Sequence, residues 1–251
     1  MTYISPNAIV EDGVYIGRNT AILAHVHLKR GTIVEDNCII GKPSRAQMGR
    51  FQELLKTQGR KLTFEDYDSV VDTPTVIGEN AQIHSGTIVY SGCTLEEGVI
   101  AEDRCVVRWD TTIGAHTKLM IAAFVGAKMT IGTHSRIGGI SGNGSKIGSY
   151  VTNFGYLIHN YTSFGGNRAE PAPTIGDFVM IGYTCNIIGG VTVGSRSYIA
   201  AGATVSRDVP PETVVIGVNQ HRPMSEWKGT LRQDYLASFP VDPLTWDETQ
   251  S

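Results

Sequence analysis

The sequence has no excess of basic residues and no long apolar segment. Its 251 residues include 21 Lys and Arg against 24 Asp and Glu, a net charge of -3. Domains that bind nucleic acids or membrane surfaces usually carry a basic patch, which this balance does not favour. No apolar run is long enough to span a bilayer, and the first residues, Met-Thr-Tyr-Ile-Ser-Pro, lack both the basic and the apolar part of a secretory signal. We therefore expect a cytoplasmic protein.

Cysteine is also scarce, and its positions exclude a disulfide framework. The four cysteines share one place of a six-residue repeat, a place otherwise held by small residues: Cys38, Cys93, Cys105 and Cys185. Free cysteine behaves as a small hydrophobic residue. We predict four packed thiols in the interior, with neither disulfides nor a cysteine-based zinc site.

The six-residue repeat is clearest in residues 173–209. An aliphatic residue, often followed by Gly, returns every six positions, and a small residue stands four places after it. This period fits neither the 3.6-residue period of a helix nor the two-residue alternation of long strands. It suits short strands joined by turns, three to a triangular coil, with successive coils paired as parallel strands. The sequence therefore predicts an all-β solenoid.

The same phase runs through most of the chain. Residues 4–40 hold seven repeats and residues 77–137 hold eleven. Residues 43–74 form an excursion with helix-like apolar spacing and many charges, either a solvated flap or a clamp for substrate phosphates. Asn143 then stands where an aliphatic residue is expected, the phase restarts at Ile147 and reaches His159, and residues 160–172 interrupt it. With the repeats of residues 173–209, the count predicts nine coils, about 43 Å of stacked strands.

The pattern indicates one β-helix domain in residues 1–217, followed by a C-terminal segment in residues 218–251. Residues 223–239 carry an apolar residue every three or four positions, as one face of a helix does. We expect this helix to cap the end of the stack or to clasp a trimer.

The motif [Ile/Leu/Val]-Gly-x-x-[small]-x resembles that of the hexapeptide-repeat acyltransferases, and the resemblance covers nearly the whole chain. It implies the left-handed parallel β-helix of that family. The handedness comes from the resemblance alone, because general crossover rules favour a right-handed turn. The resemblance also implies a homotrimer with sites between subunits, and acetyl-CoA as co-substrate.

A second resemblance concerns the segment that follows His159. In the maltose, galactoside and xenobiotic acetyltransferases, the catalytic His ends a coil, a polar loop follows, and the chain re-enters with a Pro and two Ile-Gly steps. A terminal (Thr/Ser)-(Lys/Arg)-Asp-(Val/Ile)-Pro-Pro closes the pattern. The corresponding residues are His159, Pro173-Thr-Ile-Gly-Asp-Phe-Val-Met-Ile-Gly182 and Ser206-Arg-Asp-Val-Pro-Pro211.

This resemblance implies an acyl transfer site. His159 would act as general base and take the proton of the attacking hydroxyl or amine, and Glu170 would orient its ring. The Gly182 amide would stabilise the oxyanion. By the same resemblance, Arg207 and Arg222 would bind the coenzyme A phosphates and Gly182 and Ala201 would line the cofactor. Asn160, His84 and Tyr156 would contact the acceptor, and no metal is expected.

The acceptor is less well defined. Repeats from the first residues onward, and the stretch Leu119-Met-Ile-Ala-Ala-Phe124, resemble the nucleotide-sugar and lipid A acyltransferases instead. Phe124 stands where the lipid A enzyme has its catalytic His, which leaves His159 as the base. Asn160 also replaces a Pro that is frequent in the maltose-type relatives. We expect a nucleotide-linked amino sugar as acceptor, with a simple sugar hydroxyl as the alternative.

Two other functions remain open. The stretch Val107-Arg-Trp-Asp110 resembles the Arg-x-Asp of γ-class carbonic anhydrases, which are zinc proteins. A zinc site needs three protein ligands, but residues 122–128 lack the His pair expected one coil later. The chain could also be a non-catalytic β-helix that serves as a binding or assembly module, because a fold does not imply its function.

Overall fold

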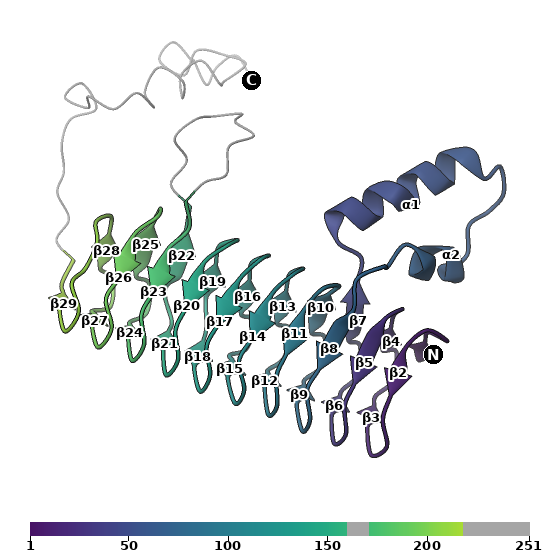
Figure 1. Ribbon diagram of the computed structural model, residues 1–251, viewed down its shortest axis with the longest axis horizontal. Coiled ribbons are helices and arrows are strands. Elements are labelled where there is room, and N and C mark those ends of the chain that lie inside the picture. Colours follow the sequence, from purple (N-terminus) through teal and green to yellow (C-terminus); the bar gives the residue numbers. More distant parts are fainter. Residues whose placement is uncertain (160–170, 218–251) are drawn as a thin grey trace, which may run out of the picture.

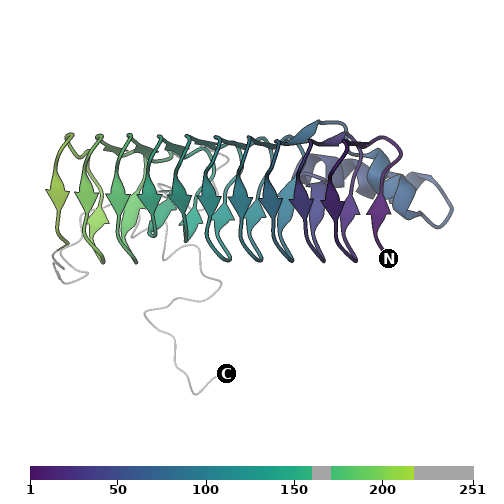
Figure 2. The same ribbon diagram turned by 90° about the horizontal axis from the view of Figure 1, so that it is seen from below.

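The computed structural model describes residues 1–159 and 171–217, and it shows a three-sided prism of short parallel strands (Figures 1 and 2). Successive strands along the chain fall on the three faces in turn, so every strand except those at the two ends of the stack pairs with the strand one coil before and one coil after it. We name the faces sheets A, B and C, in the order in which the chain visits them. The predicted solenoid is confirmed, and its architecture is consistent with the left-handed parallel β-helix.

The strands are two to four residues long. Sheet A contains β1 (Tyr3–Ile4), β4 (Ala21–Ile22), β7 (Ile39–Lys42), β10 (Ile88–Tyr90), β13 (Val106–Val107), β16 (Phe124–Val125), β19 (Ile140–Ser141), β22 (Tyr156–Ile158), β25 (Asn186–Ile188) and β28 (Thr204–Val205). Sheet B contains β2 (Ile9–Val10), β5 (Val26–Leu28), β8 (Thr75–Ile77), β11 (Thr94–Leu95), β14 (Thr112–Ile113), β17 (Thr130–Ile131), β20 (Lys146–Ile147), β23 (Thr174–Ile175) and β26 (Thr192–Val193). Sheet C contains β3 (Tyr15–Ile16), β6 (Ile33–Val34), β9 (Gln82–Ile83), β12 (Ile100–Ala101), β15 (Lys118–Leu119), β18 (Arg136–Ile137), β21 (Thr152–Asn153), β24 (Met180–Ile181), β27 (Tyr198–Ile199) and β29 (Val214–Val215).

The interior is built from the two recurring positions of the repeat. The aliphatic residue that ends most strands is fully buried, and the small residue at the next turn packs beside it in the same core. All four cysteines are free and buried at such turns, as predicted. Burial raises the pKa of Cys38 and Cys105 to about 11 and that of Cys93 to about 12, so these thiols stay protonated.

Most corners of the prism contain one residue in the left-handed region of backbone conformation. His116 and His134 are examples, with φ of 58° and 55°. This conformation costs a residue with a side chain about 1–2 kcal/mol. The corner turn requires it, and the side chain then projects outward, as predicted for these histidines.

The prediction is wrong by two residues at two corners. From Ile137 the chain reaches its next inward residue, Ser141, in four steps instead of six, and β19 pairs Ser141 with Val125. The turn is tight because Gly139 adopts a φ of 66°. Asn143 is therefore exposed in a turn and does not hold the inward place.

The corner that precedes His159 is shortened in the same way. Asn153 is inward and fully buried, and the next inward residue is Leu157, which pairs with Ser141 and Ile187. His159 lies two residues beyond Leu157, so it does not occupy the aliphatic place that we predicted for it. It stands at the corner between sheets A and B.

The stack also has one coil more than predicted. Sheets A and C contain ten strands each and sheet B nine, and an isolated bridge between Val193 and Val209 supplies the last position of sheet B. The additional inward positions are Ser141, Val209 and Val215. Residues 223–239, for which we predict a helix, lie outside the described residues.

The excursion after β7 forms two helices at the N-terminal end of the prism (Figure 1). Helix α1 (Arg45–Thr57) starts with a capping box of Ser44 and Gln47, and α2 (Phe64–Ser69) starts with one of Thr63 and Asp66. The helices stand beside the prism and leave its strand pairing intact, because β8 resumes sheet B next to β5.

Asp68 anchors the excursion to the prism. Its buried carboxylate accepts hydrogen bonds from the Ser5 hydroxyl at 2.6 Å, the Ala24 amide at 2.7 Å and the Tyr3 hydroxyl at 3.2 Å. Hydrogen bonds to a charged group are each worth about 1.5–3 kcal/mol. One residue of α2 therefore ties the helices to the first two coils.

Candidate active site

His159 follows β22 at the corner between sheets A and B, the A/B edge. The next described residue is 171, and β23 continues sheet B after it. The ring rests against the previous coil at Gly142. A Cβ atom added to Gly142 would lie 2.8 Å from His159 Cδ2 and 3.0 Å from His159 Nε2. Only a glycine therefore leaves room for the imidazole in this position.

The His159 side chain offers a free nitrogen. Its Nε2 atom is buried and has no hydrogen-bond partner among residues 1–159 and 171–217. Buried polar atoms normally have partners, and exceptions are frequently explained by function or by a bound molecule. The arrangement fits a nitrogen that is reserved for a proton-transfer partner.

Gly182 and Ala201 lie together at another edge of the prism. Both follow strands of sheet C, and a Cβ on Gly182 would meet the Ala201 nitrogen at 2.7 Å. The Gly182 amide already donates to the Ile199 carbonyl at 2.9 Å. Within the described part of the chain, the exposed Ala201 amide makes no hydrogen bond, so it is the freer donor of the two.

Arg207 lies at the A/B edge, and Tyr156 lies on the face of sheet A. Arg207 follows β28 at the same edge as His159 and lines a groove with the backbone that leads to β29. Its side chain is exposed, as an anion-binding Arg must be. Tyr156 begins β22 and is 36% exposed on sheet A, three residues from His159.

His84 is far from the other predicted site residues within one chain. It follows β9, at the sheet C to A edge, and five strand spacings separate β9 from β24, which precedes Gly182. That is about 24 Å at 4.8 Å per strand. Its ring groups instead with Glu35 and Asp103. The remaining site predictions, Asn160, Glu170 and Arg222, lie outside the described residues.

The structure adds Arg108 to the candidates. Arg108 follows β13 at the A/B edge, with its guanidinium 4.1 Å from the Trp109 ring centroid and Nη1 3.4 Å from Asn143 Oδ1. It lies three strand spacings from His159 along the edge, about 14 Å. In the sequence, the Arg-x-Asp spacing favours a zinc protein. The signal that could have identified Arg108 as a candidate site residue is its outward position directly after an aliphatic residue.

Other histidines belong to a stack of rings at the sheet B to C edge. The rings of His116, His134, Tyr150 and Phe178 follow one another at centroid distances of 5.0, 4.9 and 5.0 Å. Equivalent corner positions of successive coils hold them, so the spacing is that of the parallel strands. The stack of rings therefore follows from the repeat of the fold, and His159 is not part of it.

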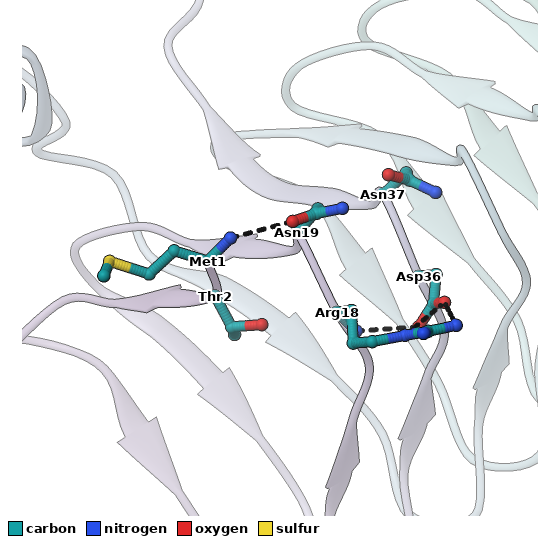
Figure 3. A pocket seen from close by; sticks show the side chains of 6 residues that line it. All are labelled: Met1, Thr2, Arg18, Asn19, Asp36 and Asn37. Carbon is teal, nitrogen blue, oxygen red and sulfur yellow. Dashed lines mark hydrogen bonds and ion pairs between the residues drawn. The ribbon is translucent and has the colours of Figure 1, made fainter.

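A hollow at the first coils involves none of the predicted site residues. Its volume is about 460 Å³, and Figure 3 shows the residues that line it: Met1, Thr2, Arg18, Asn19, Asp36 and Asn37. The Arg18 guanidinium pairs with the Asp36 carboxylate at 3.0 Å, and the Met1 ammonium donates a hydrogen bond to Asn19 Oδ1 at 2.8 Å (Figure 3). We assign no role to this hollow.

Comparison with known proteins agrees with the repeat. Residues 172–207 match the family model described as bacterial transferase hexapeptide (six repeats). Over this segment the chain is similar to the hexapeptide-repeat transferases. Its curated relatives include the bifunctional protein GlmU of Geotalea uraniireducens, 27% identical over 236 residues, which cover 90% of this chain and 43% of the relative. GlmU of Clostridium beijerinckii is 27% identical over 256 residues, with 85% and 55% covered.

The chain thus spans about half the length of these curated relatives. Among solved structures, LpxA from Acinetobacter baumannii matches with 18% identity, a TM-score of 0.43 and coverage of 99% of this chain and 85% of that one. The Francisella novicida UDP-N-acetylglucosamine acyltransferase matches with 18% identity, a TM-score of 0.29 and coverage of 86% and 67%.

In the described ranges, neither helix has the length and apolar character that a membrane span requires.

Proposed function

We propose that the protein transfers an acetyl group from acetyl-CoA to an amine or hydroxyl of a sugar or nucleotide-linked amino sugar, with His159 as general base. The observation that carries the proposal is the His159 Nε2 atom, buried against Gly142 and without a partner in the described part of the chain. A base must reach the proton it removes directly or through one water, and an imidazole is suited to this role near neutral pH.

The reaction needs no covalent intermediate on the protein. His159 takes the proton as the acceptor nitrogen or oxygen attacks the thioester carbonyl, and a tetrahedral intermediate forms. Its collapse breaks the carbon–sulfur bond, and the imidazolium returns the proton to the departing coenzyme A thiolate. Backbone donors near the carbonyl oxygen would stabilise the intermediate, and the Ala201 amide is better suited to this than the Gly182 amide, which is hydrogen-bonded to Ile199.

The proposed site requires two copies of the chain. His159 stands at the A/B edge, whereas Gly182 and Ala201 stand at the sheet C to A edge of the same prism. The edges are separated by the width of sheet A. Cyclic packing of prisms brings unlike edges of neighbouring copies together, so a homotrimer would pair the base of one subunit with the amides of the next. Arg207 would then bind a coenzyme A phosphate from an exposed position.

The comparisons support a transferase of this type. The family model that matches residues 172–207 carries the description bacterial transferase, and the curated relatives are GlmU proteins aligned over most of this chain. The resemblance to nucleotide-sugar acyltransferases motivates the choice of a nucleotide-linked amino sugar. The excursion carries the only two helices of the described residues, α1 and α2, and we propose them as candidates for acceptor selection.

Thiol release from acetyl-CoA with a panel of nucleotide amino sugars and simple sugars tests the proposal. The His159→Ala variant should lose about 10²–10⁴ in kcat, the usual contribution of a positioned general base, with acetyl-CoA affinity nearly unchanged. The acid limb of the wild-type pH–rate profile should disappear in the variant.

His134→Ala is the matched control, because His134 also stands at a corner but stacks on Tyr150 at the sheet B to C edge. It should retain full turnover. A His159→Ala enzyme that keeps most of its kcat would refute the assignment of the base. A wild-type protein that consumes no thioester with any acceptor would favour the binding or assembly module.

A further inference from the structure

Three potential metal ligands converge at the sheet C to A edge, near the N-terminal end of the prism. Glu35, His84 and Asp103 each offer one ligand atom, and these atoms all lie within 4.8 Å of one another. They belong to the turns that follow β6, β9 and β12, which are consecutive strands of sheet C. Because coils repeat every 4.8 Å or so, side chains at equivalent turns reach a common point.

The cluster is held in place by hydrogen bonds. Glu35 Oε2 accepts from the Ser85 amide at 3.0 Å and from the Ser85 hydroxyl at 2.8 Å, which leaves the other carboxylate oxygen available. The Ser85 carbonyl accepts from the Arg104 amide at 2.9 Å, so the turns that carry His84 and Asp103 are also connected. All three ligand residues are partly buried, unlike a chance group of surface carboxylates.

The charge of the cluster matches a divalent cation. The neighbouring Glu102 carboxylate pairs with the Lys118 ammonium at 2.6 Å, so its charge is compensated. Within the cluster itself, Glu35 and Asp103 contribute two negative charges, and His84 contributes a neutral nitrogen donor. One imidazole with two carboxylates suits zinc or manganese better than calcium or magnesium, which prefer oxygen ligands alone.

We propose that Glu35, His84 and Asp103 form a binding site for one divalent transition-metal ion, Zn²⁺ in preference to Mn²⁺. The order of preference follows the general affinity series of first-row metals for such ligands. The site is separate from the proposed acyl transfer site, because His84 lies about 24 Å from Gly182 along the sheet C to A edge and His159 stands at the A/B edge. It also shares no residue with the Arg-x-Asp stretch of the γ-class carbonic anhydrase hypothesis.

The position of the ligands suggests what the metal does. Glu35 precedes the excursion and His84 and Asp103 follow it, so the ion joins coils on either side of α1 and α2. A ligand that binds only the folded state raises the stability by mass action. The metal would therefore strengthen the stack where the chain connection is longest.

Metal binding to the protein stripped with a chelator tests the proposal. Calorimetric titration with ZnCl₂ should give one ion per chain, and a thermal melt with saturating zinc should show a higher Tm. MnCl₂ should bind more weakly, and CaCl₂ and MgCl₂ weakest. His84→Ala and the isosteric Asp103→Asn should each lower zinc affinity at least 100-fold, because even residues that only orient a ligand cost 10–100-fold. Ser85→Ala, which removes a hydrogen bond to Glu35, should cost about tenfold.

Two controls separate this site from other imidazoles. His27→Ala removes a partly buried His that is paired with Glu11 at 2.7 Å but lies outside the cluster, and it should leave zinc affinity unchanged. The double variant His116→Ala/His134→Ala removes two adjacent exposed rings and should also keep the stoichiometric site. The proposal fails if wild-type protein binds no zinc at millimolar concentration, or if folded His84→Ala and Asp103→Asn bind zinc as tightly as wild type. It also fails if the double variant, and not His84→Ala, abolishes binding.

Discussion

Replacing Gly142 by Ala should disable the proposed base, His159, without changing His159 itself. Gly142 does not adopt a positive φ, so an Ala is compatible with its backbone. The new Cβ would lie 2.8 Å from His159 Cδ2, 3.0 Å from His159 Nε2 and 2.9 Å from the Leu157 carbonyl oxygen. Ordinary contacts of a Cβ begin at 3.4 Å. The imidazole must therefore move outward by roughly 0.5–1 Å, and a displacement of 1 Å is enough to cost about 10²-fold in rate.

The same substitution also crowds the backbone, and a matched control removes that contribution. At Gly114, between sheets B and C, an added Cβ would lie 2.7 Å from the Gly132 carbonyl carbon and 2.9 Å from its oxygen, with no imidazole among its nearest contacts. Both variants should lose stability by about 1–3 kcal/mol, as overpacking usually does. Only Gly142→Ala should also lose kcat.

The assay compares thiol release from acetyl-CoA at saturating substrate with the Tm of each variant. We expect about a 100-fold lower kcat for Gly142→Ala and wild-type kcat for Gly114→Ala at temperatures where both are folded. A folded Gly142→Ala enzyme with wild-type kcat would show that the placement of the His159 ring does not matter for turnover. An equal loss of kcat in both variants would also refute the reasoning, because the loss would then reflect the disturbed fold and not the position of the His159 ring.

Three further predictions concern the thiols, the excursion and the assembly. The pKa of Cys38, Cys93 and Cys105 is raised in the folded state. Above about pH 8.5 the unfolded state releases the thiol protons, whereas the folded state keeps them. The free energy of unfolding should therefore fall with rising pH, by up to about 1.4 kcal/mol per pH unit for each thiol. Urea titrations at pH 7.5 and 9.5 measure this, Cys105→Ala should reduce the slope, and rapid alkylation of native protein would contradict it. Asp68→Asn should lower stability by about 2 kcal/mol and expose residues 58–63 to proteases. The variant Asp66→Asn changes the cap of α2 but not the contact with the prism, so it should not release the excursion. Equal proteolysis of both variants would count against the anchor. Light scattering should give the mass of a trimer, and a monomer at micromolar concentration would exclude the proposed two-subunit site.

The sequence was sufficient for the core but not for the register around the candidate base. Aliphatic residues six apart predicted the inward residues of most strands, because the period reflects a strand and a turn of constant length. The turns after Ile137 and Asn153 are each two residues shorter than the repeat requires. Ser141 and Leu157 therefore hold the inward places that a fixed period assigns to residues 143 and 159. The pairs Gly138-Gly139 and Phe154-Gly155 were the available signal, since glycine permits the tighter turn.

The placement of the other site residues depended on geometry that a repeat does not encode. Gly182 and Ala201, both predicted to line the cofactor, lie close together because they belong to turns that follow paired strands of successive coils. Their separation from His159 follows from which sheet precedes each residue. A linear motif gives the order of these residues but not the edge on which each one stands.

The excursion illustrates how little an insertion at a corner costs this chain. Leu28 pairs with Ile77 across it, whereas most paired residues lie 18 positions apart, as Ile4 and Ile22 do. Chain-closure entropy grows only with the logarithm of loop length, so spanning 49 instead of 18 residues costs about 0.9 kcal/mol. The hydrogen bonds to Asp68 exceed that amount. During divergence, such a scaffold can gain or exchange a specificity element at one corner while every coil above and below it continues to fold as before.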